Sequence, residues 1–202
     1  MLGIVTRHAG DRGIPEFQTT YFEAKDVSGR ASAPIEEAVN TIACFGDNAT
    51  AMGNPDLVAV DATGERADAE DPRFDWAAVC PTHAGYRAGL LEMVAEAAET
   101  APDVRLDEVG FPDTGFCRCE RCEAAFAEAA TDDRDSWRAS VVTSFIASAL
   151  EPVSGRRVVS VHPDPYPGRL RARTGVDLTT VAPLVYTIVV PLYDPAYATT
   201  YW

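Results

Sequence analysis

Four of the five cysteines in this chain have the spacing of one tetrahedral zinc site. Cys117, Cys119 and Cys122 form a C-x-C-x-x-C cluster, and Cys80 lies 37 residues before Cys117. Zinc prefers soft or borderline ligands at the corners of a tetrahedron, and such a tight turn supplies three thiolates while a second loop supplies the fourth. Four thiolates leave no open position for water, so we interpret the site as structural.

Clustered cysteines have other uses, which are disulfides, iron–sulfur clusters and redox pairs. Adjacent thiols in a C-x-C turn bridge poorly, and the N-terminus does not resemble a signal peptide, so we expect a reduced, cytoplasmic protein. The spacing matches neither common ferredoxin pattern. Cys119 and Cys122 do have the spacing of a redox pair, and His83 is a further candidate ligand close to Cys80. Cys44 lies in an apolar stretch and is interpreted as a buried apolar residue.

The composition is strongly acidic, with 31 Asp and Glu against 17 Lys and Arg and a net charge of −14. Lys25 is the sole lysine. Such a surface repels nucleic acid and anionic membranes, so we expect neither as a partner. An acidic chain poor in lysine is typical of a halophilic, salt-accumulating organism, in which the charges would be screened.

The length of 202 residues and the 47% hydrophobic content favour one domain over residues 1–202. No apolar run reaches the roughly 18 residues of a membrane span. Short apolar segments alternate with segments of helical period, which predicts a parallel sheet covered by helices. The predicted strands are 2–6, 20–24, 57–61, 104–109, 157–162 and 185–192, and the predicted helices are 33–44, 84–100, 119–130, 136–150 and 178–182.

Three segments carry a family resemblance: 80–87 beginning with Cys-Pro-Thr-His, 104–112 with Asp-Glu, and 116–126 with the cysteine cluster. Their order resembles the middle of a glycoside-hydrolase-type (β/α)8 barrel. It is similar to the zinc-carrying beta-galactosidases of glycoside hydrolase family 42 and to uncharacterised glycosidase-like barrels, and it extends over roughly 57–193. The resemblance implies a TIM-barrel-like α/β fold, incomplete at about six strands, with zinc bound beside the barrel.

The Asp107-Glu108 pair is the first candidate for catalytic carboxyl groups. The resemblance to the galactosidases places Glu108 at the general acid/base, whereas the uncharacterised relatives carry an aspartate at the position of Asp107. Strand alternation turns Val104 and Leu106 toward the helices and Asp107 into the barrel, with Glu108 pointing outward unless the strand has ended. We predict that Asp107 lines the pocket with Glu108 beside it. An acidic surface loop would give the same dipeptide, and the galactosidases have asparagine in place of Asp107.

A glycosidase needs a second carboxyl group, which enzymes of this type take from a later strand. The possible stand-ins are Asp194 and Asp164, although both precede proline and are also plausible turn residues. The candidate substrate-binding residues lie near the ends of the last two predicted strands, and turn formation or packing explains them equally well. They are His162, Asp164, Tyr166 and Tyr193.

Two classes of function follow from these residues. The first is a glycoside hydrolase-like protein that acts on a carbohydrate through carboxyl acid/base catalysis. The second is a degenerate, zinc-stabilised barrel scaffold that binds a sugar or a protein partner without catalysis. An incomplete barrel also leaves strand edges open, so we expect the chain to form a homo-oligomer or to cover those edges.

Overall fold

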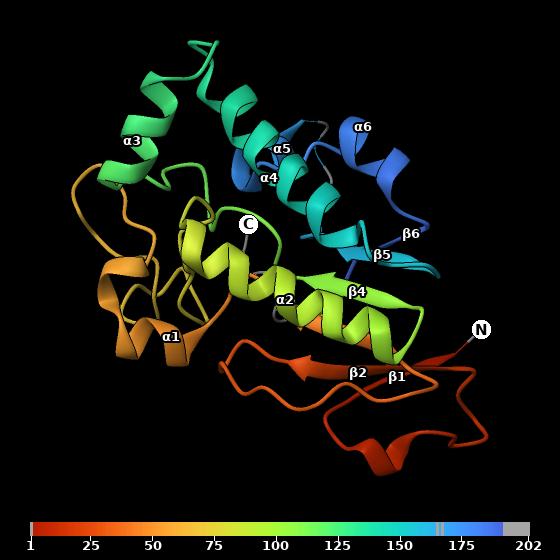
Figure 1. Ribbon diagram of the computed structural model, residues 1–202. Coiled ribbons are helices and arrows are strands. Elements are labelled where there is room, and N and C mark those ends of the chain that lie inside the picture. Colours follow the sequence, from red (N-terminus) through yellow and green to blue (C-terminus); the bar gives the residue numbers. More distant parts are fainter. Residues whose placement is uncertain (1, 165, 167, 192–202) are drawn as a thin grey trace.

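The computed structural model describes residues 2–164, 166 and 168–191, and within them the fold is a curled, parallel six-stranded half-barrel (Figure 1). Each strand pairs in parallel with the next strand in the sequence. This strand order is that of a (β/α) barrel, because in a doubly wound sheet the order of the strands reverses at a switch point. The strands are β1 (Gly3–Thr6), β2 (Thr19–Lys25), β3 (Val39–Ala43), β4 (Val104–Asp107), β5 (Arg157–Ser160) and β6 (Thr187–Val189).

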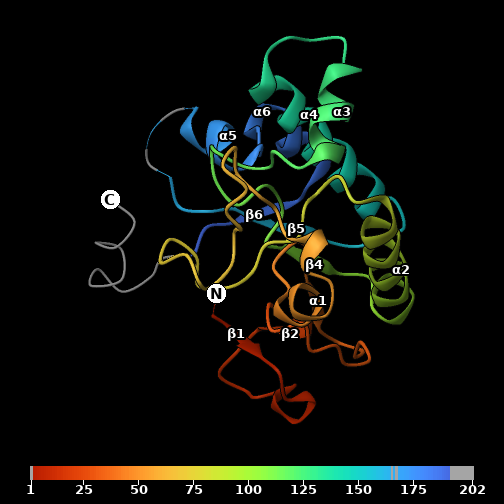
Figure 2. The same cartoon turned by 90° about the vertical axis from the view of Figure 1, so that its left-hand side faces the viewer.

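Two long helices, α2 (Ala84–Thr100) and α4 (Arg134–Leu150), pack against each other, and α2 also contacts β3 and β4 (Figures 1 and 2). Both were predicted from their apolar period. The remaining helices are α1 (Asn48–Gly53), α3 (Glu120–Ala127), α5 (Arg169–Thr174) and α6 (Leu178–Val181), with short 3-10 turns η1 (Ala9–Asp11), η2 (Pro55–Leu57) and η3 (Ala182–Leu184).

The core lies between the sheet and these two helices. On β4, Val104 and Leu106 are fully buried and belong to this core, together with Leu90 of α2 and Phe145 of α4. Because side chains alternate along a strand, Arg105 and Asp107 project from the opposite face of β4. The apolar stripes of α2 and α4 therefore fix which face of the sheet remains for polar side chains.

The prediction of a helix over 33–44 was wrong, because this segment contains β3. All five residues of β3 are buried, and a short, continuous buried run cannot be assigned to helix or strand by periodicity alone. The side chain of Asn40 also holds the preceding loop in a non-helical conformation. It accepts a hydrogen bond from the backbone N–H of Ile35 and donates one to the carbonyl of the same residue.

The predicted strand at 57–61 is also absent from the six-stranded sheet. This segment follows η2 and forms isolated antiparallel bridges, in which Val58 pairs with Val79 and Val60 pairs with Arg66. The predicted number of strands agrees with the structure only because β3 was missed and 57–61 was counted in its place. The chain after β3 is instead occupied by α1, η2 and a long irregular segment that leads to Cys80.

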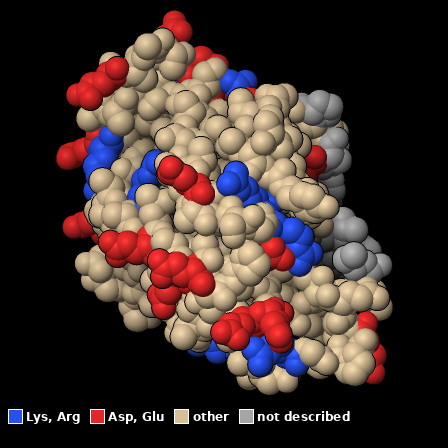
Figure 3. All heavy atoms as spheres, turned by 45° about the vertical axis from the view of Figure 1, so that its right-hand side comes forward, with Lys and Arg blue, Asp and Glu red and all other residues tan. Residues whose placement is uncertain are grey.

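The surface carries acidic side chains with basic ones among them, as Figure 3 shows for one face. Many of the arginines are paired with carboxylates, for example Arg7 with Glu23 and Arg156 with Asp103. In the described part of the chain, no helix combines the length and the apolar character needed to cross a bilayer.

Candidate functional site

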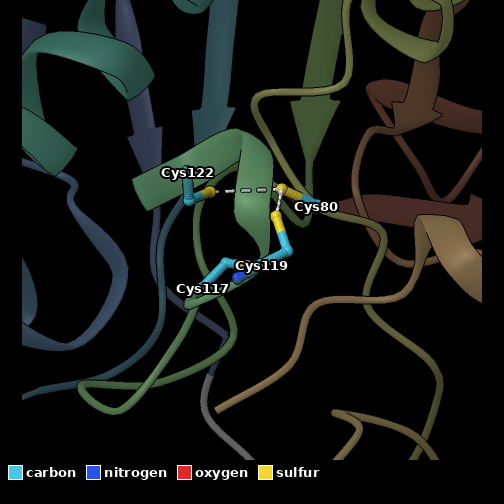
Figure 4. Close-up of side chains that lie close together, drawn as sticks. All are labelled: Cys80, Cys117, Cys119 and Cys122. Atoms are coloured by element: carbon cyan, nitrogen blue, oxygen red, sulfur yellow. Dashed lines mark hydrogen bonds between the residues drawn. The ribbon is translucent and has the colours of Figure 1, made fainter. Parts of the chain in front are cut away.

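The four predicted cysteines meet in one cluster (Figure 4). Cys80 lies on the loop that leads into α2, Cys117 and Cys119 directly precede α3, and Cys122 lies in the first turn of α3. Their four sulfur atoms all lie within 4.8 Å of one another. The Sγ atom of Cys80 is 3.4 Å from that of Cys122 and 3.6 Å from that of Cys119.

These separations fit a metal centre. With Zn–S bonds of about 2.3 Å, the edge of a regular tetrahedron of sulfurs is about 3.8 Å. Three of the four thiols are almost completely buried. Hydrogen bonds with Cys117 and Cys122 lower the pKa of Cys80 to about 7, while the contact with Cys119 and burial oppose this shift. A soft tetrathiol set suits zinc or another thiophilic ion, and it leaves no coordination position for a substrate.

Thr82 contacts the cysteine cluster and His83 caps the helix that follows it, two roles that the sequence did not indicate. The hydroxyl of Thr82 lies 3.1 Å from the sulfur of Cys80 and 3.3 Å from that of Cys122. His83 is not part of the cysteine cluster. Its Nδ1 atom accepts a hydrogen bond from the backbone N–H of Tyr86 and thereby caps the N-terminus of α2, so the imidazole secures the helix that follows Cys80.

A second polar cluster lies at the C-terminal end of β4, where barrels of this type carry their catalytic groups. The guanidinium of Arg105 donates hydrogen bonds to Asp107 at 2.8 Å and to the hydroxyl of Ser160 on β5 at 2.7 Å. It also stacks over the ring of Tyr21 on β2. Asp107 is therefore an arginine-paired carboxylate on the polar face of the sheet, and its role in a pocket stays a prediction.

Glu108 escapes the alternation of β4 because the strand ends at Asp107. Its backbone has a positive φ of 49°, a left-handed conformation that costs a non-glycine residue about 1–2 kcal/mol. The backbone N–H of Glu108 donates to the side chain of Asp107. Strained backbone of this kind concentrates at functional sites, because the surrounding structure must enforce it.

The surroundings of Glu108 favour its protonated form. Burial raises the pKa of Glu108 to about 8, and the negative charge of Asp107 adds to this effect. Arg105 and a hydrogen bond with the side chain of Trp76 act in the opposite direction. A carboxylic acid that keeps its proton at neutral pH is suited to general acid catalysis.

His162 follows β5 and reaches the same cluster. Its Nε2 atom lies 3.8 Å from a carboxyl oxygen of Glu108. Burial and the charge of Arg173 lower the pKa of His162, and the charges of Asp107 and Asp113 oppose this shift. These effects favour the neutral imidazole, which can donate or accept a hydrogen bond beside the carboxyl group of Glu108.

The other predicted substrate-binding residues follow His162 in the sequence or lie outside the described residues. The side chain of Asp164 is buried, and its carboxylate lies 3.7 Å from Arg169 and 3.6 Å from Arg173. Tyr166 is exposed, and the guanidinium of Arg169 lies over its ring. Tyr193 and Asp194 lie outside the described residues, so their predicted roles remain predictions.

Sequence reasoning missed Trp76. It lies in a polar, irregular segment with no periodicity, 32 residues before Glu108. The available signal was an isolated aromatic residue in an acidic loop close to a predicted metal ligand. Such a signal gives no indication of the residue that Trp76 contacts.

Comparison with solved structures shows that the fold of this chain is similar to that of several known proteins. The chain matches the PgaB (BpsB) glycoside hydrolase domain from Bordetella bronchiseptica with a TM-score of 0.60 and 13% identity, over 76% of this chain and 50% of that structure. It matches alpha-L-fucosidase isoenzyme 2 from Paenibacillus thiaminolyticus with a TM-score of 0.56 and 15% identity, over 75% of this chain and 30% of that one. The likeness is one of fold.

A shorter structure also matches along nearly its whole length. It is a hypothetical protein from Ruminiclostridium thermocellum, with a TM-score of 0.55 and 14% identity, and the match covers 77% of this chain and 94% of that protein. The chain spans half of the PgaB domain structure. No protein-family model matches the chain, and no curated protein matches it either.

Proposed function

We propose that this chain is a glycoside hydrolase-like domain that cleaves or binds a carbohydrate at the C-terminal end of β4. The observation that carries the proposal is the pair formed by Glu108 and Asp107. One carboxyl group is buried with a pKa of about 8, and its neighbour is bound by Arg105. The half-barrel fold, shared with glycoside hydrolase domains, supports the choice of a carbohydrate as substrate.

In this proposal Glu108 is the general acid. It donates its proton to the oxygen of the glycosidic bond as that bond breaks, and the leaving sugar departs as a neutral alcohol. Asp107, which is paired with Arg105, stabilises the positive charge that develops on the sugar ring. This refines the expectation from the sequence, in which Asp107 lines the pocket with Glu108 beside it, by giving the two groups different roles.

His162 completes the polar end of the proposed site. Its neutral imidazole next to Glu108 can bind a sugar hydroxyl. Because it is uncharged, it adds no second positive charge to that of Arg105 beside the acid. Asp194 remains the candidate for an attacking or base carboxylate. Zinc is proposed for the cysteine cluster in a structural role, because the four thiolates fill a tetrahedral shell.

The proposal is tested by hydrolysis of a panel of chromogenic glycosides and of oligosaccharides. We expect Glu108→Gln to lower kcat by about 100-fold or more, because general acid catalysis contributes about 100- to 10,000-fold. Asp107→Asn should lower kcat as well. Glu92→Gln, which changes an exposed glutamate on α2, is the matched control. Full activity in both site variants would refute the catalytic roles.

The alternative function is a scaffold that binds a sugar or a protein partner without catalysis. The observation that favours it is the state of Asp164, whose carboxylate is engaged by two arginines and is therefore a poor nucleophile. Calorimetry with oligosaccharides separates the two functions. Binding without turnover in the wild-type protein, at every pH from about 5 to 9, would support the scaffold.

A further inference from the structure

The cysteine cluster and the carboxyl pair are joined by one short extended segment, residues 76–80, which we call the strap. On one side, the N–H of Val79 donates to the carbonyl of Phe45 at 2.7 Å, and the carbonyl of Ala77 accepts from Asp47. On the other side, the carbonyl of Ala78 accepts from Ala59, and the N–H of Cys80 donates to Leu57. The strap is therefore hydrogen-bonded along both edges.

The two ends of the strap lie in the two clusters. Cys80 closes the tetrathiol set at one end. At the other end, the side chain of Trp76 forms a hydrogen bond with Glu108. Since indole Nε1 can only donate, the carboxyl oxygen of Glu108 is the acceptor.

The indole of Trp76 is also confined by the backbone of Gly46. A Cβ atom added at Gly46 would lie 3.0 Å from both Cδ1 and Nε1 of Trp76, and 3.0 Å from a methyl group of Val27. Such contacts are tighter than ordinary packing, so a larger residue at this position would push the indole away from Glu108. Gly46 itself forms an antiparallel bridge with Ala78 of the strap.

We propose that Trp76 is a positioning residue for the carboxyl group of Glu108, and that the tetrathiol centre keeps Trp76 in place through the strap. This inference rests on the proposed role of Glu108 as the acid. In this inference the tetrathiol centre takes no part in the reaction but affects the position of the Glu108 carboxyl group through Trp76. The strap is the physical connection, because its hydrogen bonds leave Trp76 little freedom once Cys80 is fixed.

The charged and titratable groups that face Glu108 come from several elements. Asp107 and Arg105 belong to β4, and His162 follows β5. Cys44, at the end of β3, is buried close enough for the charge of Glu108 to raise its pKa. The strap contributes Trp76, which is a hydrogen-bond donor without a charge.

The test follows the indole N–H resonance of Trp76 by NMR as the pH is varied, and it needs no substrate. In the metal-loaded wild-type protein, this resonance should titrate with a midpoint near 8, the pKa of Glu108. Glu108→Gln should abolish the titration, and Trp76→Phe identifies the signal. An indole resonance that does not change with pH, or that titrates unchanged in Glu108→Gln, refutes the contact between Trp76 and Glu108.

Three perturbations then test positioning. Trp76→Phe keeps the ring but removes the donor to the carboxylate, so the midpoint of Glu108, followed by ¹³C NMR, should rise by about one unit. Gly46→Ala should shift the midpoint as well, whereas Gly89→Ala on α2, where an added Cβ meets nothing within 4 Å, should leave it unchanged. An unmoved midpoint in both Trp76→Phe and Gly46→Ala refutes the positioning role.

Removal of the metal by a chelator is the third perturbation. The indole signal of Trp76 should lose its response to Glu108 ionisation while Trp137, which is packed in the core, keeps its resonance. If the Trp76 signal titrates unchanged after verified metal removal, the role of the strap is refuted. A Glu108 midpoint that shifts as much in the control Gly89→Ala as in Gly46→Ala refutes it as well. If no glycoside is hydrolysed but these NMR results hold, the proposed function fails while the positioning of Glu108 stands.

Discussion

Loss of one cysteine ligand should release the metal and destabilise the protein by an amount that the loop length sets. Cys80 and Cys117 are 37 residues apart in sequence. A cross-link that closes a loop of this length lowers the chain entropy of the unfolded state, which stabilises the folded state by about 4 kcal/mol at 25 °C. Cys117, Cys119 and Cys122 are close in sequence and retain some affinity for metal in the unfolded chain, which reduces the effect. We therefore expect Cys80→Ala to cost about 2–4 kcal/mol.

The assay is metal analysis combined with thermal unfolding. Wild-type protein should carry about one zinc per chain, and for a domain of this size the loss should lower the unfolding temperature by about 5–15 °C. Cys44→Ala is the matched control, because Cys44 is equally buried but is not part of the cluster. It should retain the metal and the response to chelation.

Two results would refute this reasoning. One is Cys80→Ala protein that still holds one equivalent of metal with wild-type affinity. The other is wild-type protein whose unfolding temperature does not change when a chelator has removed the metal. Either result would mean that the four sulfur atoms, although within 4.8 Å of one another, do not stabilise the fold through a shared ion.

Three further predictions concern charged groups. The folded-state pKa of Glu108 is raised to about 8. The contribution of Glu108 to the free energy of unfolding is therefore complete below its ordinary pKa and declines as the pH rises toward 8, by up to about 5 kcal/mol. Urea unfolding of Glu108→Gln should lack this decline, and stability curves against pH that run parallel in the variant and the wild type would contradict it. Asp47→Asn should cost about 3–5 kcal/mol by chemical denaturation, since it leaves the buried Lys25 without its carboxylate at 3.1 Å; a cost below about 1 kcal/mol would show that the pair is solvated. The net charge of −14 predicts an unfolding temperature that rises with KCl concentration as repulsion is screened; a salt-independent value would argue against a halophilic protein.

Features that depend on local chemistry were predictable from the sequence. The cysteine spacing identified the cluster because three of the four cysteines lie within six residues. The apolar period of α2 and α4 reported the burial of Leu90 and Phe145 correctly. These signals depend on neighbours in the sequence, which a single chain displays directly.

Features that depend on tertiary contacts were not predictable. β3 is buried along its whole length, so it lacks the alternation that distinguishes a strand from a short buried helix. The orientation of Glu108 depends on β4 ending at Asp107, two residues before the predicted end, and on a left-handed backbone at Glu108. The contact between Trp76 and Glu108 joins positions 32 residues apart through the strap, and no periodic pattern encodes it.

The central claim is that Glu108 is a protonated acid at neutral pH. The most direct measurement is ¹³C NMR of protein labelled at the glutamate side-chain carboxyl carbon, with the Glu108 signal assigned by its loss in Glu108→Gln. We predict a titration midpoint of about 8 for this carboxyl group in the metal-loaded protein. A midpoint below about 5, in the range of an ordinary glutamate, would contradict the proposed acid.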